Sequence, residues 1–134
     1  MIRFRHTLGI LAVIFLAVGL GTGCQTRMAE KLRPSHDQVL VYPLAFDLTY
    51  LRTMEALENV EDWELEETEK EKGMIRVRNI NFSQFDDADE SVAVFLLKRL
   101  GRSQTSIELA PESRRVADGD KLFSRIEEFI AREL

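Results

Sequence analysis

The chain has 134 residues and a formal net charge of −5, from 18 basic and 23 acidic side chains. An acidic balance argues against nucleic-acid binding, which needs a basic face, and against broad electrostatic docking on anionic lipid. The length allows one small domain after any N-terminal leader, and a single cysteine excludes an intrachain disulfide.

Residues 1–23 have the three parts of a secretory signal. Arg3 and Arg5 precede a run from Leu8 to Leu20 that is apolar or glycine throughout, and small residues then lead to Cys24. This run of 13 residues is shorter than the roughly 20 that a spanning helix needs. We expect a signal peptide over residues 1–23, so the remaining chain keeps 16 basic and 23 acidic side chains, a net charge of −7.

The end of this segment resembles the bacterial lipobox. Thr22, Gly23 and Cys24 fit that motif, whereas Gly21 stands where leucine is usual. The resemblance implies that Cys24 is lipidated and that the bond before it is cut, which would anchor the protein to a membrane through several acyl chains. Gln25 follows, instead of the aspartate of inner-membrane retention, and this favours the outer membrane facing the periplasm. The alternatives are an ordinary cleaved signal with a free thiol, or an uncleaved anchor.

Residues 24–38 are expected to form the lipidated cysteine and a flexible tether. The stretch is polar, lacks a sustained period and contains Pro34. His36, which is the single histidine after the signal, is expected to be a solvated loop residue and not a ligand. The folded domain should therefore occupy residues 39–134.

The domain is expected to begin with a brief strand at Val39–Tyr42, stopped by Pro43. Proline suits the first position of a helix, so we expect a helix from Pro43 to about Asn59. Apolar residues recur in it at spacings of three and four, and this pattern predicts a core-facing stripe of Leu44, Leu48, Leu51 and either Met54 or Leu57, widened by Phe46 and Tyr50.

A β-hairpin is predicted from residues 63–70 and 74–82, with its turn at Glu71-Lys72-Gly73. Apolar and charged residues alternate in both segments. We expect the outer face of the hairpin to pair acidic side chains of the first strand with basic ones of the second: Glu64 and Glu66 with Arg76 and Arg78.

The segment after the hairpin, residues 81–91, is expected to be a solvated acidic loop. Its acids are Asp86, Asp87, Asp89 and Glu90. Hard cations prefer such oxygen ligands, but the spacing is not that of an EF-hand and the loop has no glycine to turn it. We therefore expect no metal site, with a weak cation site as the alternative.

Residues 91–100 predict a strand that is apolar on both faces. Either both faces are buried within the monomer, or one face meets something else. The second option makes Val92, Val94, Phe95 and Leu97 a possible partner patch. A further strand is expected at Thr105–Ala110, followed by a C-terminal helix that begins near Asp118 or Asp120. The apolar stripe of that helix comprises Leu122, Phe123, Ile126, Phe129 and Ile130.

These elements predict an α+β fold in the order β-α-β-β-β-β-α. Short connections favour a four-stranded antiparallel meander sheet, with two helices packed on one face. The element order, the tryptophan and glycine of WELEETEKEKG, and the tether after the cysteine resemble the helix-grip domains of small outer-membrane lipoproteins, such as those of the BamC accessory subunit. The resemblance covers residues 39–134.

No catalytic constellation stands out in this chain. There is no Gly-x-Ser-x-Gly elbow, metal-ligand pair or phosphate loop. We therefore expect no catalytic residue and no cofactor, and interpret the protein as a non-catalytic binding or accessory module of the envelope that contacts a protein partner or a second copy of itself. The alternatives are a periplasmic carrier of lipid or another small ligand, and an envelope hydrolase that uses a carboxylate pair.

Overall fold

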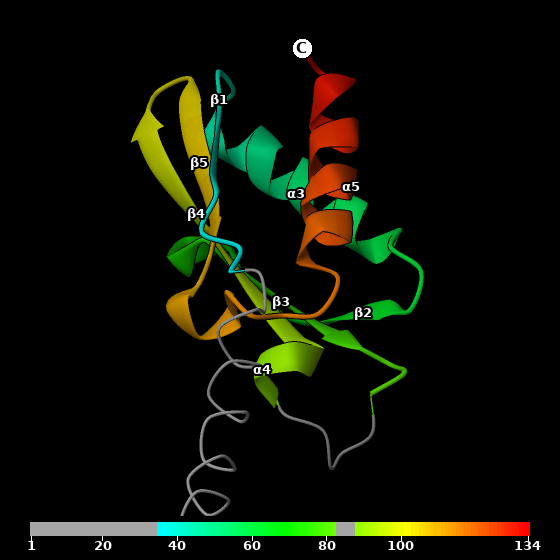
Figure 1. Ribbon diagram of the computed structural model, residues 1–134. Helices are drawn as coiled ribbons and strands as arrows, with labels where there is room; N and C mark the ends of the chain where they lie inside the picture. Colours follow the sequence, from blue (N-terminus) through cyan, green and yellow to red (C-terminus); the bar gives the residue numbers. More distant parts are fainter. Residues whose placement is uncertain (1–34, 83–87) are drawn as a thin grey trace, which may run out of the picture. The chain divides into compact units, whose positions relative to one another are not determined.

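Five strands form one antiparallel sheet in the order β1-β5-β4-β3-β2 (Figure 1). The computed structural model describes residues 35–82 and 88–134, within a compact unit that runs from Pro34 to Leu134. The strands are β1 (Val39–Tyr42), β2 (Trp63–Glu69), β3 (Met74–Asn79), β4 (Val92–Gly101) and β5 (Gln104–Leu109). The helices are α3 (Phe46–Glu58), α4 (Ala88–Ser91) and α5 (Gly119–Ala131), with 3₁₀ turns η1 (Lys70–Lys72) and η2 (Pro111–Ser113).

The α+β class and the antiparallel sheet are confirmed, but the prediction of four strands is wrong. Strands β2 to β5 form the expected meander, and β1 joins them as a fifth strand beside β5, with Val39 opposite Glu108 and Tyr42 opposite Thr105. The partner of β1 lies more than 60 residues away in sequence. Local periodicity identifies the strand but carries no information on such a distant pairing.

The β2–β3 hairpin has the predicted turn. Gly73 has a φ of +67°, a left-handed conformation that glycine adopts without steric cost. A side chain there would also meet the backbone, because an added Cβ would lie 2.1 Å from the carbonyl oxygen of Leu97. The glycine therefore permits both the turn and the close approach of β4, whose Leu97 N–H donates to the carbonyl of Gly73.

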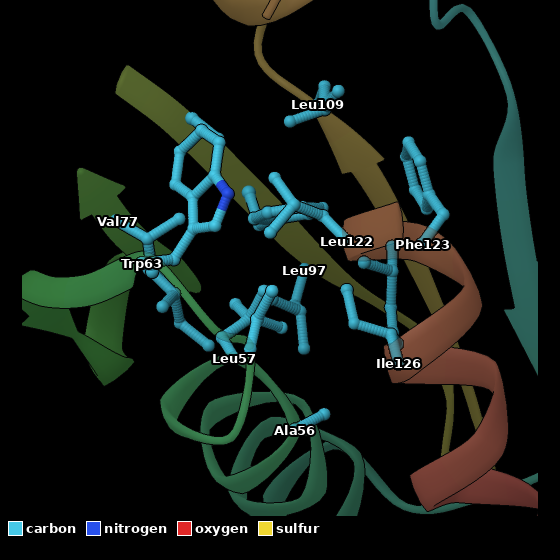
Figure 2. Close-up of a cluster of buried hydrophobic side chains, with 14 of the residues drawn as sticks. Ala56, Leu57, Trp63, Val77, Leu97, Leu109, Leu122, Phe123 and Ile126 are labelled. Carbon is cyan, nitrogen blue, oxygen red and sulfur yellow. The ribbon is translucent and has the colours of Figure 1, made fainter. Parts of the chain in front are cut away.

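The core lies between the sheet and the two long helices (Figure 2). The inward face of β4 carries Ala93, Phe95 and Leu97, all buried. The ring of Phe95 meets that of Phe123 on α5 edge to face, with centroids 5.5 Å apart. The predicted stripe of the C-terminal helix is buried against this face, apart from the half-buried Phe129.

The prediction for the first helix is partly wrong. The helix begins at Phe46 and not at Pro43, and Leu51 of the predicted stripe is 43% exposed. The fully buried face instead includes Thr49 and Thr53. Each threonine hydroxyl donates to a carbonyl one turn earlier, so the polar group is satisfied and the methyl group packs inward.

The folded unit also begins earlier than expected. Residues 35–38 were predicted to belong to the tether, yet His36 is only 8% exposed and its backbone N–H donates to the carbonyl of Arg114. In the parts of the chain that the structure describes, no helix is long and apolar enough to cross a membrane.

Candidate functional site

The predicted partner patch on β4 is not an exposed surface. Phe95 and Leu97 lie in the core, and Val94, on the opposite face of the strand, is only 6% exposed. The Val94 N–H donates to the hydroxyl of Ser113 in η2, which lies against β4. Val92 is half-buried. Of the two interpretations of this apolar strand, burial within the monomer is the one that the structure shows.

Several sequence predictions fall outside the described residues. Cys24 lies there, so its lipidation stays a prediction. Asp86 and Asp87 of the acidic loop lie there too, and the side chain of Asp89 is likewise not described. The chain resumes at α4, which occupies the end of the segment that was expected to be loop throughout.

His36 is a packed residue and not the solvated loop residue that was predicted. Its Nδ1 lies 3.3 Å from a carboxylate oxygen of Asp120 in the first turn of α5. Its ring occupies the space above Gly119, where an added Cβ would lie 2.3 Å from the ring Cδ2. The chain is therefore fixed to the start of α5 three residues before β1 begins.

The outer edge of β1 is the feature that we consider the candidate functional site. Strand β1 ends the sheet, and no described residue pairs with its outer side. Leu40 and Tyr42 point toward the core, whereas Val39 and Val41 lie on the opposite face and are 52% and 49% exposed. All four side chains are uncharged. An unpaired strand edge presents backbone N–H and C=O groups on which another strand can be added.

Strand β1 is held by its ladder with β5 and by the packing of Leu40 and Tyr42 against the core. Burial raises the pKa of the Tyr42 hydroxyl to about 12, and the nearby carboxylate of Glu127 contributes in the same direction. Just after the strand, the hydroxyl of Thr105 on β5 donates to the carbonyl of Leu44. The edge is thus presented by a fixed strand, which lowers the entropy that binding would lose.

The nearest charges on the open face of the sheet are neutralised. Glu108, opposite Val39 in the register, forms an ion pair with Lys98 of β4. Ser106, opposite Val41, is neutral and buried. A strand placed along β1 would therefore meet valine side chains and no unpaired charge on this side.

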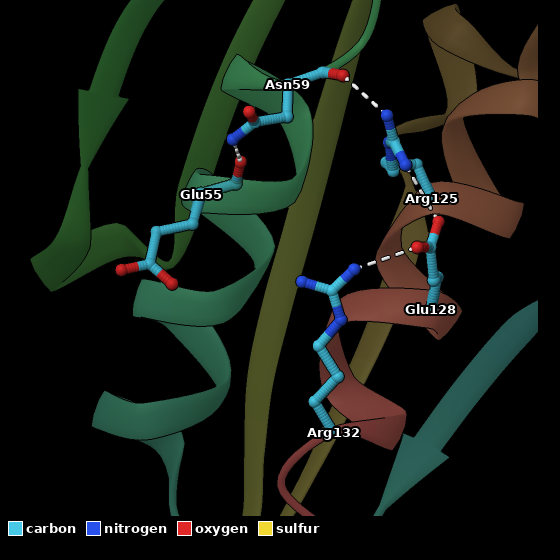
Figure 3. Close-up of polar contacts among 5 residues, drawn as sticks. All are labelled: Glu55, Asn59, Arg125, Glu128 and Arg132. Atoms are coloured by element: carbon cyan, nitrogen blue, oxygen red, sulfur yellow. Dashed lines mark hydrogen bonds and ion pairs between the residues drawn. The ribbon is translucent and has the colours of Figure 1, made fainter.

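Two hollows in the described surface are lined by side chains that make structural contacts. The first, of about 310 Å³, lies beside the end of α3 and has charged residues Lys121, Arg125 and Glu128 in its lining. The Arg125 guanidinium donates to the carbonyl of Asn59, 3.0 Å away, and pairs with Glu128 at 2.8 Å (Figure 3). Because α3 has no basic residue in its last turn, this arginine supplies the positive charge that a helix C-terminus favours.

The second hollow, of about 300 Å³, lies next to the hairpin turn. The guanidinium of Arg99 sits 5.3 Å from the centre of the Phe46 ring at its wall, a cation–π contact. Glu71 and Lys72 supply opposite charges. The Arg125, Glu128 and Arg99 side chains of the two hollows are engaged in these structural contacts, so the edge of β1 is the stronger candidate.

No protein-family model matches the chain, and no curated protein matches its sequence at a significant level. The sequence-based prediction placed the contact on β4, the most apolar strand, and the fold buries that strand in its interior. The signal it could have used is a short uncharged strand stopped by proline, which is typical of a sheet edge.

Proposed function

We propose that this protein is a lipid-anchored envelope lipoprotein whose domain is a non-catalytic binding module, and that it makes protein–protein contact through the outer edge of β1. In this proposal Cys24 carries the lipid, and the outer membrane facing the periplasm is the expected location. The helix-grip resemblance supports the setting but does not identify a partner.

The observation that carries the proposal is the chemistry of the β1 edge. It is a fixed, uncharged edge strand with two half-exposed valines, Val39 and Val41. Natural sheets protect their edges with charge, a bulge, a proline, a short strand or a covering element. Strand β1 is short and is followed by Pro43, but it has no charge and no bulge, and no described strand pairs with its outer side. A strand from a partner would satisfy its backbone groups and bury the valines.

The position of the edge relative to the anchor supports a role close to the membrane. Since His36 belongs to the folded unit, the tether is shorter than first expected. Ten residues, 25–34, would reach at most about 33 Å if fully extended. The β1 edge begins five residues after Pro34, so a partner bound there would also be held near the bilayer.

The carrier alternative receives less support. In the described residues, the space between the sheet and the helices is occupied by packed side chains, among them Leu122, Phe123 and Ile126, which are fully buried (Figure 2). A carrier needs an apolar cavity in that place.

A charge at the edge tests the contact. Val41→Lys adds a charge to a half-exposed position, so the fold should be retained. Leu51→Lys on α3 is the matched control, because Leu51 is similarly exposed. After crosslinking in intact cells, we expect Val41→Lys to reduce the crosslinked protein at least about tenfold, the equivalent of 1.4 kcal/mol, while Leu51→Lys leaves it unchanged. Equal yields from both variants would contradict the proposal.

The anchor is tested separately by the intact mass of the purified native protein. Cleavage before Cys24 and a diacylglyceryl adduct on it are expected. An unmodified thiol or an uncut leader would overturn the lipoprotein part of the proposal and leave the edge contact to be judged by crosslinking.

A further inference from the structure

We propose that the occupant of the β1 edge is a second copy of this chain, paired antiparallel through β1 so that the two sheets become continuous. This inference rests on the proposed function, because it takes the edge to be a contact site. It adds the identity of the partner, the symmetry of the contact and the residues that face each other.

The edge of β1 is self-complementary. A two-fold symmetric contact brings the same patch of both copies together, so a patch that carries charges of one sign repels itself. Strand β1 has no charged residue, and the neighbouring Glu108 is neutralised by Lys98. Valine is a favourable residue in pleated, half-buried strand pairs. The patch therefore meets the main requirement for pairing with itself.

The alternation along β1 favours one register. When the two-fold axis is perpendicular to the sheet, the helices of both copies lie on the same side, and paired residues must point to the same face. Placing Leu40 opposite Leu40 of the second copy sets Val39 opposite Val41 of that copy, twice by symmetry. This register pairs all four half-exposed valines and leaves Pro43 beyond the paired segment.

The other edge of the sheet explains why the assembly would stop at two copies. Strand β2 is interrupted by a bulge between Leu65 and Glu67 and carries acidic side chains at Glu64, Glu66, Glu67 and Glu69. The bulge disturbs the ladder that another strand would need, so β2 is a poor edge for pairing even though Glu66, Glu67 and Glu69 are balanced by Arg76 and Lys72. With one competent edge per copy, pairing closes as a dimer and does not extend into a fibre.

Anchoring favours this partner over a free one. Copies tied to the same membrane by short tethers are concentrated in a thin layer, and tethering raises effective concentration without any new contact. An interface made by only four residues of each strand is weak between free domains, so it gains most from a raised effective concentration. The length of chain between Cys24 and β1 thus supports a second copy as the occupant.

Disulfide trapping in the membrane tests the register. Two differently tagged full-length chains are co-expressed, one with Val39→Cys and the other with Val41→Cys, and crosslinking is followed after mild oxidation. Directly opposed residues lie within disulfide range, whereas like positions in this register are diagonal neighbours about 7–8 Å apart. We expect at least about fivefold more heterotypic than homotypic crosslink, reflecting this difference in distance.

The controls separate the two proposals. Chains with each single substitution and chains with only Cys24 measure crosslinks that do not depend on the register. A pair on the other edge, Glu64→Cys with Glu67→Cys, should give no heterotypic product. Adding Leu40→Lys to both copies should abolish the Val39–Val41 crosslink by placing two like charges opposite each other.

The outcome decides between partners. A heterotypic crosslink lost in the Leu40→Lys background supports the second copy. If copies do not crosslink but a photoreactive group at Val41 captures a different protein, the second-copy inference is overturned and the contact function stands. If Val41 captures neither, both proposals fail. Where Leu40→Lys lowers stability, native mass measurement of the detergent-purified chain gives the same decision, with a dimer expected for the wild type and a monomer for Val41→Lys.

Discussion

The two edges of the sheet, β1 and β2, solve the same physical problem in opposite ways. Strand β2 is acidic and bulged, and its Glu66 carboxylate pairs with Arg76 and Arg78 of the neighbouring strand. Strand β1 is short, uncharged and regular, and its outward valines are half-exposed. Since both are terminal strands, their difference cannot come from topology and reflects the chemistry of their side chains.

This comparison separates an edge that is protected from one that is available. Charges and a bulge make strand addition to β2 unfavourable. Strand β1 has neither charge nor bulge, so its outer backbone groups are open to another strand. The contact of His36 with Asp120 fixes the chain just before β1 to the start of α5. We therefore expect changes near β2 to affect stability without affecting association, and changes near β1 to affect both.

The largest expected effect is at the turn that joins β2 to β3. Gly73→Ala places a Cβ 2.1 Å from the Leu97 carbonyl oxygen in a left-handed backbone, so we expect about 3 kcal/mol of lost stability. Denaturant unfolding measures it. Gly101→Ala is the control, because its Cβ would meet nothing nearer than 3.9 Å, and its effect should stay below about 0.5 kcal/mol. Similar losses in the two variants would contradict this view of the turn.

A smaller loss of stability is expected where His36, just before β1, packs on Gly119. Gly119→Ala drives a Cβ into the His36 ring, and overpacking of this kind costs about 1–2 kcal/mol. In a His36→Ala background the same change should become neutral or stabilising by about 0.5 kcal/mol, since alanine is the better helix residue. The free energies of unfolding of the wild type, the two single variants and the double variant give the coupling between the two positions. Equal losses of stability from Gly119→Ala in both backgrounds would contradict the packing of His36 on Gly119.

Alkaline pH should act through β1 as well. The pKa of Tyr42 is raised from 10.0 to about 12, so the unfolded chain ionises first. The stabilisation is complete below pH 10 and is lost as the pH rises toward 12. Because Tyr42 as a whole is only partly buried, on an edge strand, screening should limit the loss to about 1 kcal/mol. The stability of Tyr42→Phe should not show this part of the decline at alkaline pH. Parallel profiles of stability against pH for the wild type and the variant would contradict a role of Tyr42.

The smallest effect is expected at the charged edge of β2. Glu66→Gln removes the shared partner of Arg76 and Arg78 and leaves Arg76 only its longer contact with Glu67; exposed ion pairs contribute about 0.5 kcal/mol. The loss should disappear at high salt, whereas the loss in Gly73→Ala should persist. Glu64→Gln is the control, because Glu64 forms no ion pair among the described residues. An equal, salt-independent effect of both changes would show that the pairs do not contribute.

Sequence reasoning was most successful where structure is local. The hairpin turn at Gly73, the meander from β2 to β5 and the stripe of α5 all follow from residues close together in the chain. The prediction for the charges of the hairpin was right for Glu66, which pairs with both Arg76 and Arg78, and wrong for Glu64, which forms no ion pair among the described residues. The bulge places Glu66 between the two arginines instead of opposite one. A one-residue insertion of this kind leaves no clear mark on the alternating pattern.

It was least successful for the candidate site. The search for a contact surface favoured Val94 and Phe95 because they are apolar, yet the fold buries both. In α3 the hydropathy pattern predicted that Leu51 is buried, but Thr49 and Thr53 are buried instead. Their hydroxyls donate hydrogen bonds to backbone carbonyls one turn earlier. Hydropathy measures the tendency to leave water, and it does not identify which apolar groups find room inside.

By itself, the sequence determined the local elements: alternating strands, an amphipathic last helix and a glycine where the backbone turns left-handed. These depend on interactions between near neighbours, which period and composition record. Only the tertiary structure decided that β1 completes the sheet beside β5, that His36 packs on Gly119, and that one edge is left uncharged and unpaired. Those outcomes depend on contacts between residues distant in the chain, where steric fit and competition for the core select among many pairings that local patterns permit equally.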